Sequence, residues 1–250
     1  MNTLEVKHLT VKVGDKKILD NVSLTIKKGE TCVVMGPNGS GKSTLANVLM
    51  GHPSYEVISG KIIFNGKDIT KKKAEERAAL GLFMTFQSPR EIVGVDFYPF
   101  LFDTYKFLQA ARKEKALSVF EFKKKLDKEI AALKITDDWS QRCLNQGFSG
   151  GEKKKAEMLQ LAIFKPSFVI FDEIDSGLDV DALKVVGRAM KKFKKPETSA
   201  LIVTHYLRIL QEIEADQVIV MSAGKIIKTG GPELAHRLEK EGFEKIIAQK

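Results

Sequence analysis

The sequence contains little cysteine, little proline and no long apolar run. Its 250 residues include 2 Cys and 7 Pro. Cys32 and Cys143 lie far apart and form no C-x-x-C pair, so the sequence predicts neither a disulfide framework nor a zinc site, and we expect two buried thiols. No stretch approaches the ~18 consecutive apolar residues of a membrane-spanning helix. The first residues also contain no apolar signal-peptide core, so we expect a cytoplasmic protein.

Positive charge is in surplus, with 41 Lys and Arg against 32 Asp and Glu and a formal net charge of +9. Nucleic acid or an anionic membrane could attract such a charge. The lysines, however, are spread over short runs such as Lys71–Lys73 and Lys153–Lys155, and no aromatic residues interleave with them to stack on bases. We therefore expect a solvated basic surface, with no nucleic-acid partner and no direct membrane insertion.

The first third and the last third of the chain show strand patterns. Val22, Leu24 and Ile26 alternate, and a continuous apolar run at 31–35 is typical of a buried strand. An Asn65-Gly66 hairpin signal closes a strand at 60–64. Later strands alternate with helices, which predicts a largely parallel sheet covered on both faces. The expected later elements are strands at 168–171, 200–203 and 217–221, helices at 181–193 and 207–213, and a closing amphipathic helix with Leu234, Leu238 and Ile246.

The middle of the chain has a different pattern. Between about Gln87 and Pro166 the strand signals disappear, and apolar residues recur at helical spacing, as at Phe120, Leu126 and Ile130. This pattern predicts a helical insertion.

A glycine-rich loop at 36–43 matches the phosphate-binding P-loop pattern G-x-x-x-x-G-K-[ST], also called Walker A, between a buried strand and a helix. Its glycines let backbone N–H groups surround phosphate oxygens, with help from the positive end of the helix. We expect Lys42 to reach the β and γ phosphates and the Ser43 hydroxyl to ligate Mg²⁺. The residues expected to hold the nucleotide here are Gly36, Pro37, Asn38, Gly39, Ser40, Gly41, Lys42, Ser43 and Thr44.

Two carboxylates follow the apolar strand at 168–171. A P-loop protein needs a second magnesium anchor on a neighbouring strand, and Asp172 stands where that anchor is expected. Glu173 projects further, so it can accept a proton from the attacking water as a general base.

A second glycine-rich loop, Phe148–Glu152, precedes another expected helix. On local grounds it is a helix start, with Ser149 or Gly151 near the cap and Glu152 in the first turn. The order of P-loop, Gln87, Ser-Gly-Gly loop, Asp-Glu pair and His205 is similar to that of the ABC ATPase family over nearly the full length. Phe148–Glu152, called the signature loop below, then corresponds to the family signature, with Glu152 where Gln is usual.

The resemblance implies an α/β P-loop NTPase of ABC type, with a RecA-like core, an antiparallel β region and an inserted helical subdomain. Residues 1–250 would form one domain, with 1–86 and 167–250 as the core and 87–166 as the helical subdomain. The implied activity is Mg²⁺-dependent ATP hydrolysis. Val13 stands where many members have an aromatic residue that stacks on adenine.

The resemblance also implies that two cassettes associate transiently, head to tail. The signature loop of one chain, through Ser149, Gly150 and Gly151, would close over the γ-phosphate held by the other. Asp179, in the segment 176–179, would link the two sites. His205 would sense the γ-phosphate, and Gln87 would touch Mg²⁺ or the attacking water.

Several stretches are similar to the SufC group of this family, the ATPases of Suf iron–sulphur cluster assembly. They are 51–57, 86–95, 147–154, 172–186 and 204–210, although Lys155 and Ala156 stand where Arg and Asn are expected. This similarity implies soluble SufB-like and SufD-like scaffold partners. An ATP-binding subunit of an ABC transporter would share every catalytic residue and stays open as the alternative. A nucleic-acid machine stays open too, although such proteins usually carry a coiled coil or two fused cassettes.

Overall fold

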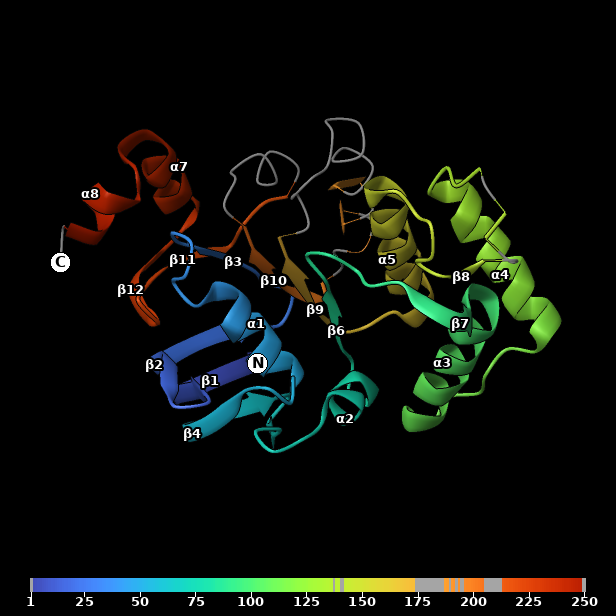
Figure 1. Cartoon of the computed structure of the whole chain (residues 1–250), viewed down its shortest axis with the longest axis horizontal. Helices are drawn as coiled ribbons and strands as arrows, with labels where there is room; N and C mark the ends of the chain where they lie inside the picture. Colours follow the sequence, from blue (N-terminus) through green and yellow to red (C-terminus); the bar gives the residue numbers. More distant parts are fainter. Residues whose placement is uncertain are drawn as a thin grey trace.

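β-Strands form three sheets in the part of the chain that the computed structural model describes (Figure 1). The six-stranded sheet is parallel from β11 to β6, and β12 pairs antiparallel with β11. The described residues are 2–136, 138–139, 142–173, 187–188, 190–191, 193, 196–204 and 213–248. In spatial order the six strands are β12 (Lys225–Gly230), β11 (Gln217–Ser222), β3 (Thr31–Met35), β10 (Ser199–Val203), β9 (Phe168–Asp172) and β6 (Leu82–Thr85).

The four-stranded antiparallel sheet confirms the alternation in the first third. Val22, Leu24 and Ile26 are buried, while the residues between them are exposed. Asn65 and Gly66 both have positive φ, 48° and 76°, as a tight hairpin turn requires. In spatial order its strands are β2 (Lys16–Lys27), β1 (Asn2–Val13), β4 (Glu56–Phe64) and β5 (Lys67–Asp68).

Two hydrophobic cores cover opposite faces of the six-stranded sheet. Successive side chains of a strand point to opposite faces. In β3, Cys32 and Val34 pack in one core with α1 and the four-stranded sheet, whereas Val33 and Met35 pack in the other with α5. α1 and α5 therefore lie on opposite faces. The helices are α1 (Lys42–Met50), α2 (Ala74–Ala79), α3 (Phe97–Ala111), α4 (Val119–Ala132), α5 (Gly150–Phe164), α7 (Pro232–Glu241) and α8 (Phe243–Ala248).

The middle of the chain is helical as expected. It also contains two strands that the sequence did not predict, and the buried face of α4 differs from the predicted one. Figure 1 shows α3, α4 and α5 together beside β6, and with them a two-stranded sheet of β7 (Ile92–Asp96) and β8 (Cys143–Leu144). β7 carries no alternation because all five of its residues are exposed. Phe120 is 80% exposed, whereas Phe122 is fully buried, so the buried stripe of α4 starts two residues later than the periodicity suggested.

The last third follows the prediction with small differences. The closing helix is two helices, because Gly242 with φ 79° separates α7 from α8. The expected helix at 207–213 lies almost wholly outside the described residues. Of the expected helix at 181–193, only residues 187–188, 190–191 and 193 are described. Cys32 is buried as expected, but Cys143 is partly exposed.

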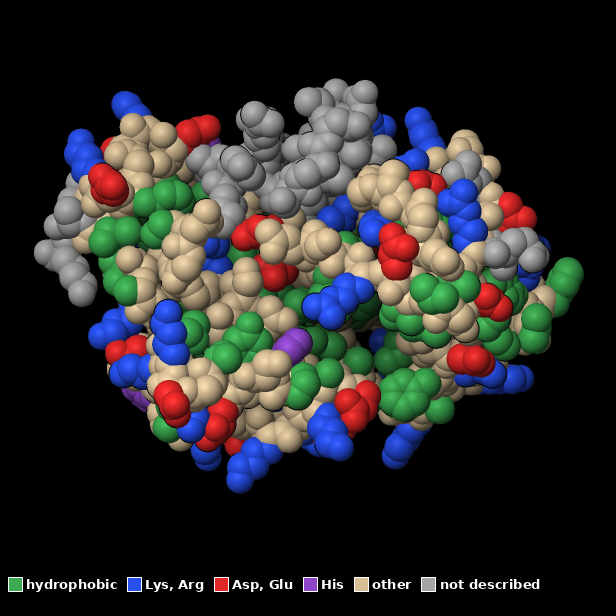
Figure 2. Space-filling model, in the orientation of Figure 1, with side chains coloured by type: hydrophobic (Ala, Val, Ile, Leu, Met, Phe, Trp, Pro, Cys, Tyr) green, Lys and Arg blue, Asp and Glu red, His purple; other side chains and the backbone are tan. Residues whose placement is uncertain are grey.

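The surface and the helices can be compared with the expectations of a solvated basic surface and of no membrane insertion. On the face shown in Figure 2, basic side chains lie among acidic and uncharged ones rather than in one continuous basic field. Within the described residues, no helix combines the length and the apolar character needed to cross a bilayer.

Candidate nucleotide site

Four neighbouring parallel strands bring the predicted site segments to one edge of the sheet. Register pairs Val34 of β3 with Val203 of β10, Val203 with Asp172 of β9, and Phe171 with Thr85 of β6. Adjacent strands lie about 4.8 Å apart. The P-loop after β3, the carboxylates at the end of β9 and Gln87 after β6 therefore gather at the carboxyl ends of the strands, where open α/β sheets bind ligands.

The P-loop needs glycine at two positions for steric reasons. A Cβ on Gly36 would collide with the carbonyl oxygen of Met221, and one on Gly41 would lie 2.8 Å from Leu19 Cδ2. Both glycines have positive φ, 157° and 102°. Gly224 N also donates to Ser40 O at 2.9 Å, so the turn between β11 and β12 holds the backbone of the P-loop in place.

The N-terminal end of α1 is left open. Its cap residue is Gly41, no side chain of the described residues caps it, and its first turn contains no acidic residue. Lys42 is buried and donates from Nζ to the carbonyl oxygens of Gly36 at 2.9 Å and Pro37 at 3.0 Å. Burial lowers the pKa of Lys42, and the charges of Glu173 and Asp172 oppose that shift. This end presents N–H groups and an ammonium to an anion.

The opposite end of α1 is held by a buried guanidinium. Arg77, 2% exposed, donates from Nη1 to Val48 O at 2.7 Å and Leu49 O at 2.9 Å. Burial lowers its pKa to about 10, so the group stays charged at neutral pH. A cation at the carboxyl end of a helix favours the helix dipole.

Asp172 fits a magnesium anchor. It is 4% exposed, and its Oδ1 has no hydrogen-bond partner among the described residues. Burial raises the pKa of Asp172 to about 6, the charge of Glu173 adds to this, and the Ser43 hydroxyl hydrogen bond and the charges of Lys154 and Lys42 oppose it. Carboxylate and hydroxyl oxygens are ligands that Mg²⁺ prefers. The oxygen atoms of Asp172 and Ser43 therefore fit Mg²⁺, and the assignment of both residues as its ligands stays a prediction.

Glu173 and Gln87 meet beside this anchor. Gln87 Nε2 donates to Glu173 Oε2, although 86 residues separate the two in sequence. Glu173 has φ 47°, a left-handed conformation that is uncommon outside glycine, and its N–H donates to Val203 O at 2.9 Å. The structure thus joins two residues that the sequence analysis placed in the site for separate reasons.

The signature loop confirms the local interpretation as a helix start. Ser149 caps α5: its Oγ accepts from Glu152 N at 3.3 Å, and Glu152 Oε2 accepts from Ser149 N at 2.8 Å. Arg142 pairs with Glu152 at 3.3 Å. Apart from the turn's own backbone, no atom of the described residues lies within 4 Å of a Cβ placed on Gly150 or Gly151, so these glycines have open space beside them. Asp179 and His205 lie outside the described residues.

One charged pair of α5 was missed in the sequence. Lys154 and Glu157 are both buried and contact the backbone of Phe86, next to Gln87. The signal that could have revealed them is two opposite charges three residues apart on the stripe of α5 that also carries buried Met158 and Leu161.

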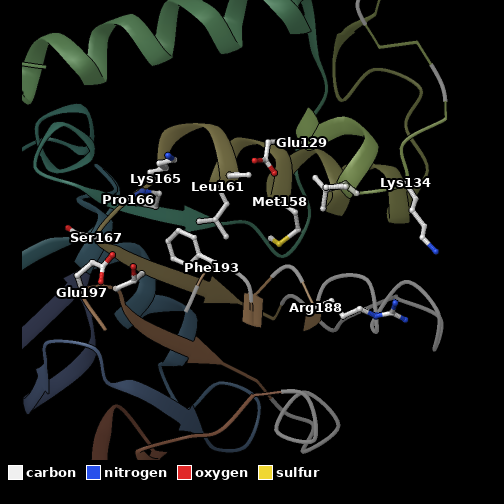
Figure 3. A pocket seen from close by; sticks show the side chains of 14 residues that line it. Glu129, Lys134, Met158, Leu161, Lys165, Pro166, Ser167, Arg188, Phe193 and Glu197 are labelled. Atoms are coloured by element: carbon white, nitrogen blue, oxygen red, sulfur yellow. The ribbon is translucent and has the colours of Figure 1, made fainter. Parts of the chain in front are cut away.

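A separate cavity lies away from these residues. It has a volume of about 520 Å³ and is lined by residues of α4, α5 and the segment before β9, together with others such as Phe193. Figure 3 shows the lining side chains, among them Met158, Leu161 and Phe193. None of the predicted site residues that the structure describes lines it.

The fold and the P-loop geometry define a P-loop nucleotide-binding protein, and comparisons refine this class. The family model described as "ABC transporter" matches residues 19–176. Vegetative protein 296 of Bacillus subtilis (strain 168) is 47% identical over 245 residues, 97% of this chain and 92% of that protein. Probable ATP-dependent transporter slr0075 of Synechocystis sp. is 44% identical over 241 residues, 96% of this chain and 94% of that protein.

A solved structure agrees. The chain resembles the ADP conformation of MJ1267, an ATP-binding cassette of an ABC transporter, with a TM-score of 0.78, 27% identity and 100% coverage of both chains. The chain therefore belongs to the ABC transporter ATPase family, as the order of its motifs predicted. It is an ATP hydrolase of the ABC type that binds ATP with Mg²⁺.

Proposed function

We propose that the edge of the sheet described above is the catalytic site, with Glu173 as the general base. The observation that carries this assignment is the hydrogen bond from Gln87 to Glu173, next to the buried Asp172. Glu173 accepts the proton of the attacking water, and Gln87 orients the Glu173 carboxylate. Lys42 and the other P-loop residues bind the phosphates. Ser43, Asp172 and Gln87 would hold Mg²⁺, which would neutralise charge on the phosphates.

The test of this site is Glu173→Gln, which keeps the side-chain shape and removes the proton acceptor. Loss of a general base lowers rate by ~10²–10⁴-fold. ATP turnover is measured together with a titration of nucleotide binding, which should stay near the wild-type value. Glu75→Gln, the same change on the exposed face of α2, serves as the matched control. Turnover of Glu173→Gln within about threefold of wild type would overturn the assignment.

We further propose that hydrolysis needs two chains. α1 and α5 lie on opposite faces of the six-stranded sheet, Ser149 is exposed, and a Cβ on Gly150 or Gly151 would meet no other described atom within 4 Å. The signature loop of one chain is therefore free to close on the P-loop nucleotide of a second chain. In this proposal Asp179 links the two sites and His205 senses the γ-phosphate.

The biological role that we propose is that of the ATPase subunit of a cytoplasmic iron–sulphur cluster assembly complex of the Suf type. The long stretches similar to SufC support it. Exposed apolar residues also flank Gln87 in the sequence: Phe86 before it and Val93 after it are 52% and 75% exposed, and Ile92 and Val95 of β7 are exposed as well. Exposed apolar groups of this kind are typical of interaction sites. SufB-like and SufD-like scaffolds would bind there, and closure of two cassettes would remodel them.

The alternative role is the ATP-binding subunit of a transporter, because relatives such as slr0075 are named as transporters. A membrane permease would engage the same surface. To separate the two roles, the native complex is isolated and its subunits are identified by mass. ATPase rates and cluster formation are then compared for wild type and Glu173→Gln.

The assembly role predicts soluble partners that accelerate hydrolysis, because a shared scaffold raises the effective concentration of one cassette near the other. It also predicts slower cluster formation with Glu173→Gln. A stable integral membrane permease as the partner, or cluster formation indifferent to hydrolysis, would replace the assembly role by the transporter role.

A further inference from the structure

The helix α5 carries two opposite charges inside the protein. The side chains of Lys154 and Glu157 are 4% and 5% exposed, and Lys154 Nζ lies 3.2 Å from Glu157 Oε2. A buried ion pair adds little stability unless further hydrogen bonds satisfy its remaining donors and acceptors. The partners of those remaining atoms therefore indicate what the pair does.

Both side chains bind the same residue of a distant segment. Glu157 Oε1 accepts from Phe86 N at 2.6 Å, and Lys154 Nζ donates to Phe86 O. The Phe86 ring is 52% exposed, so the pair contacts the backbone of this residue while much of the ring faces solvent. Two bonds to the N–H and the C=O of one residue fix both the position and the orientation of the chain at that point.

This contact lies between two functional segments. Gln87 follows Phe86 directly and donates to Glu173. On the other side, Lys154 is five residues after Ser149, within the same helix that the signature loop begins. The charge of Lys154 also acts on Asp172. A connection of hydrogen bonds and one ion pair thus runs from the signature helix to the predicted base through Lys154, Glu157, Phe86 and Gln87.

We infer that Lys154 and Glu157 form a positioning pair that fastens the Gln87 segment to the signature helix, so that a displacement of α5 is transmitted to the Gln87–Glu173 hydrogen bond. The inference rests on the proposed roles of Gln87 and Glu173. Neither Lys154 nor Glu157 acts on the nucleotide in this scheme. They set where Gln87 stands when the signature loop moves.

The first test removes the pair but keeps the interior apolar and filled, as Lys154→Met combined with Glu157→Leu. Apolar replacement of both members of a buried ion pair is tolerated far better than removal of one. We expect ATP turnover to fall by at least ~10-fold, because a small misplacement near reacting groups is costly. Lys155→Met, the same change on the next residue of α5, should stay within about twofold of wild type. Thermal unfolding of each variant checks that the fold is kept.

The second test separates positioning from a general structural role. The same double change is made in a Gln87→Ala background and the two effects are compared. If the Lys154–Glu157 pair acts through Gln87, the double change made in the Gln87→Ala background lowers turnover by no more than about twofold. A full ~10-fold loss in that background, or no loss in the wild-type background, would overturn the inference.

A wrong role for Gln87 and a wrong role for the Lys154–Glu157 pair would give different experimental results. If Gln87→Ala alone keeps turnover within about threefold of wild type, the role of Gln87 is wrong and the inference falls with it. If Gln87→Ala is slow and removal of the pair is harmless, only the inference falls. Should the double variant not fold, Glu157→Gln takes its place, because it keeps an acceptor for Phe86 N and removes the charge. A smaller loss of ~3-fold that vanishes in the Gln87→Ala background supports the inference, and any other result overturns it.

Discussion

Two helices of this protein, α1 and α5, begin after glycine-rich loops. They differ in whether side chains already bind the backbone N–H groups of the first turn. α1 begins after Gly41, without a side-chain cap among the described residues and with Thr44 as its third residue. α5 begins after Ser149, whose side chain and that of Glu152 satisfy each other's backbone N–H groups. A cap residue and a carboxylate at the third position consume N–H groups, whereas their absence leaves N–H groups for a ligand.

The comparison shows that a glycine-rich loop before a helix has two meanings. In the proposed mechanism, the open end of α1 binds the nucleotide of its own chain. At α5 the backbone N–H groups of Ser149 and Glu152 are already satisfied internally, so in the same proposal its glycines offer close approach to a second chain instead. The predictions below test this difference, from the largest expected effect to the smallest.

Lys42→Ala should have the largest effect, since it removes the ammonium from the open end of α1. Phosphate charge then lacks its main side-chain counterion, and we expect turnover to fall by ~10²-fold or more with weaker binding of Mg²⁺-ATP. The measurements are steady-state ATPase rates and nucleotide titration. Wild-type affinity together with wild-type turnover would show that the loop is only structural.

Ser149→Arg should lower turnover strongly but leave nucleotide binding unchanged, because in the proposed two-chain mechanism it fills the turn that the partner chain approaches. A mixture with Lys42→Ala is informative, since one intact composite site can form between the two variants. We expect the mixture to regain activity that neither variant has alone. An inactive mixture, with dimer formation demonstrated by light scattering, would contradict action across two chains.

The raised pKa of Asp172 predicts a pH effect on stability. In the folded chain this carboxyl binds a proton up to about pH 6, and its ordinary pKa is 3.8. The folded state therefore binds more protons between these values, and the free energy of unfolding falls as pH rises through them. Relative to Asp172→Asn, nucleotide-free wild type should lose at most about 3 kcal/mol between about pH 4 and about pH 6.5. Denaturant unfolding at several pH values measures the difference, and parallel curves would show that Asp172 has an ordinary pKa.

Changes in the cap of α5 should have the smallest effects. Ser149→Ala removes the acceptor for Glu152 N and should cost ~1 kcal/mol of unfolding free energy. Glu152→Gln keeps an acceptor for Ser149 N but loses the charge that faces Arg142, a partly exposed pair worth about 0.2–1 kcal/mol. Thermal unfolding of the two variants gives both values. A larger cost for Glu152→Gln than for Ser149→Ala would mean that the ion pair with Arg142, not the cap, holds this turn.

Much of the fold could be predicted because its strands carry strong local patterns. The buried run at 31–35, the alternation of Val22, Leu24 and Ile26, and the Asn65-Gly66 turn each correspond to an observed element. β7 could not be predicted, since an exposed strand has no alternation between a buried and an exposed face. The phase of α4 was misjudged because Phe120 and Phe122 are equally apolar, and only packing shows which of the two is buried.

The site was predictable where one segment carries the whole signal, as in the P-loop and the strand that ends at Asp172. Hydrogen bonds between segments that lie far apart in the sequence could not be predicted. The contact of Gln87 with Glu173 spans 86 positions, and that of Phe86 with Glu157 spans 71. Such contacts depend on the order of strands in the sheet, which local sequence does not determine.

The guanidinium of Arg77 has a consequence for thermal motion in the P-loop. α1 has nine residues, fewer than the ~12–15 that an isolated helix needs to persist in water. Its carbonyl end is fastened through two hydrogen bonds from Nη1, while its other end faces a ligand that comes and goes. We therefore expect the two hydrogen bonds from Arg77 of α2 to restrain the motion of Lys42 from the far end of the helix.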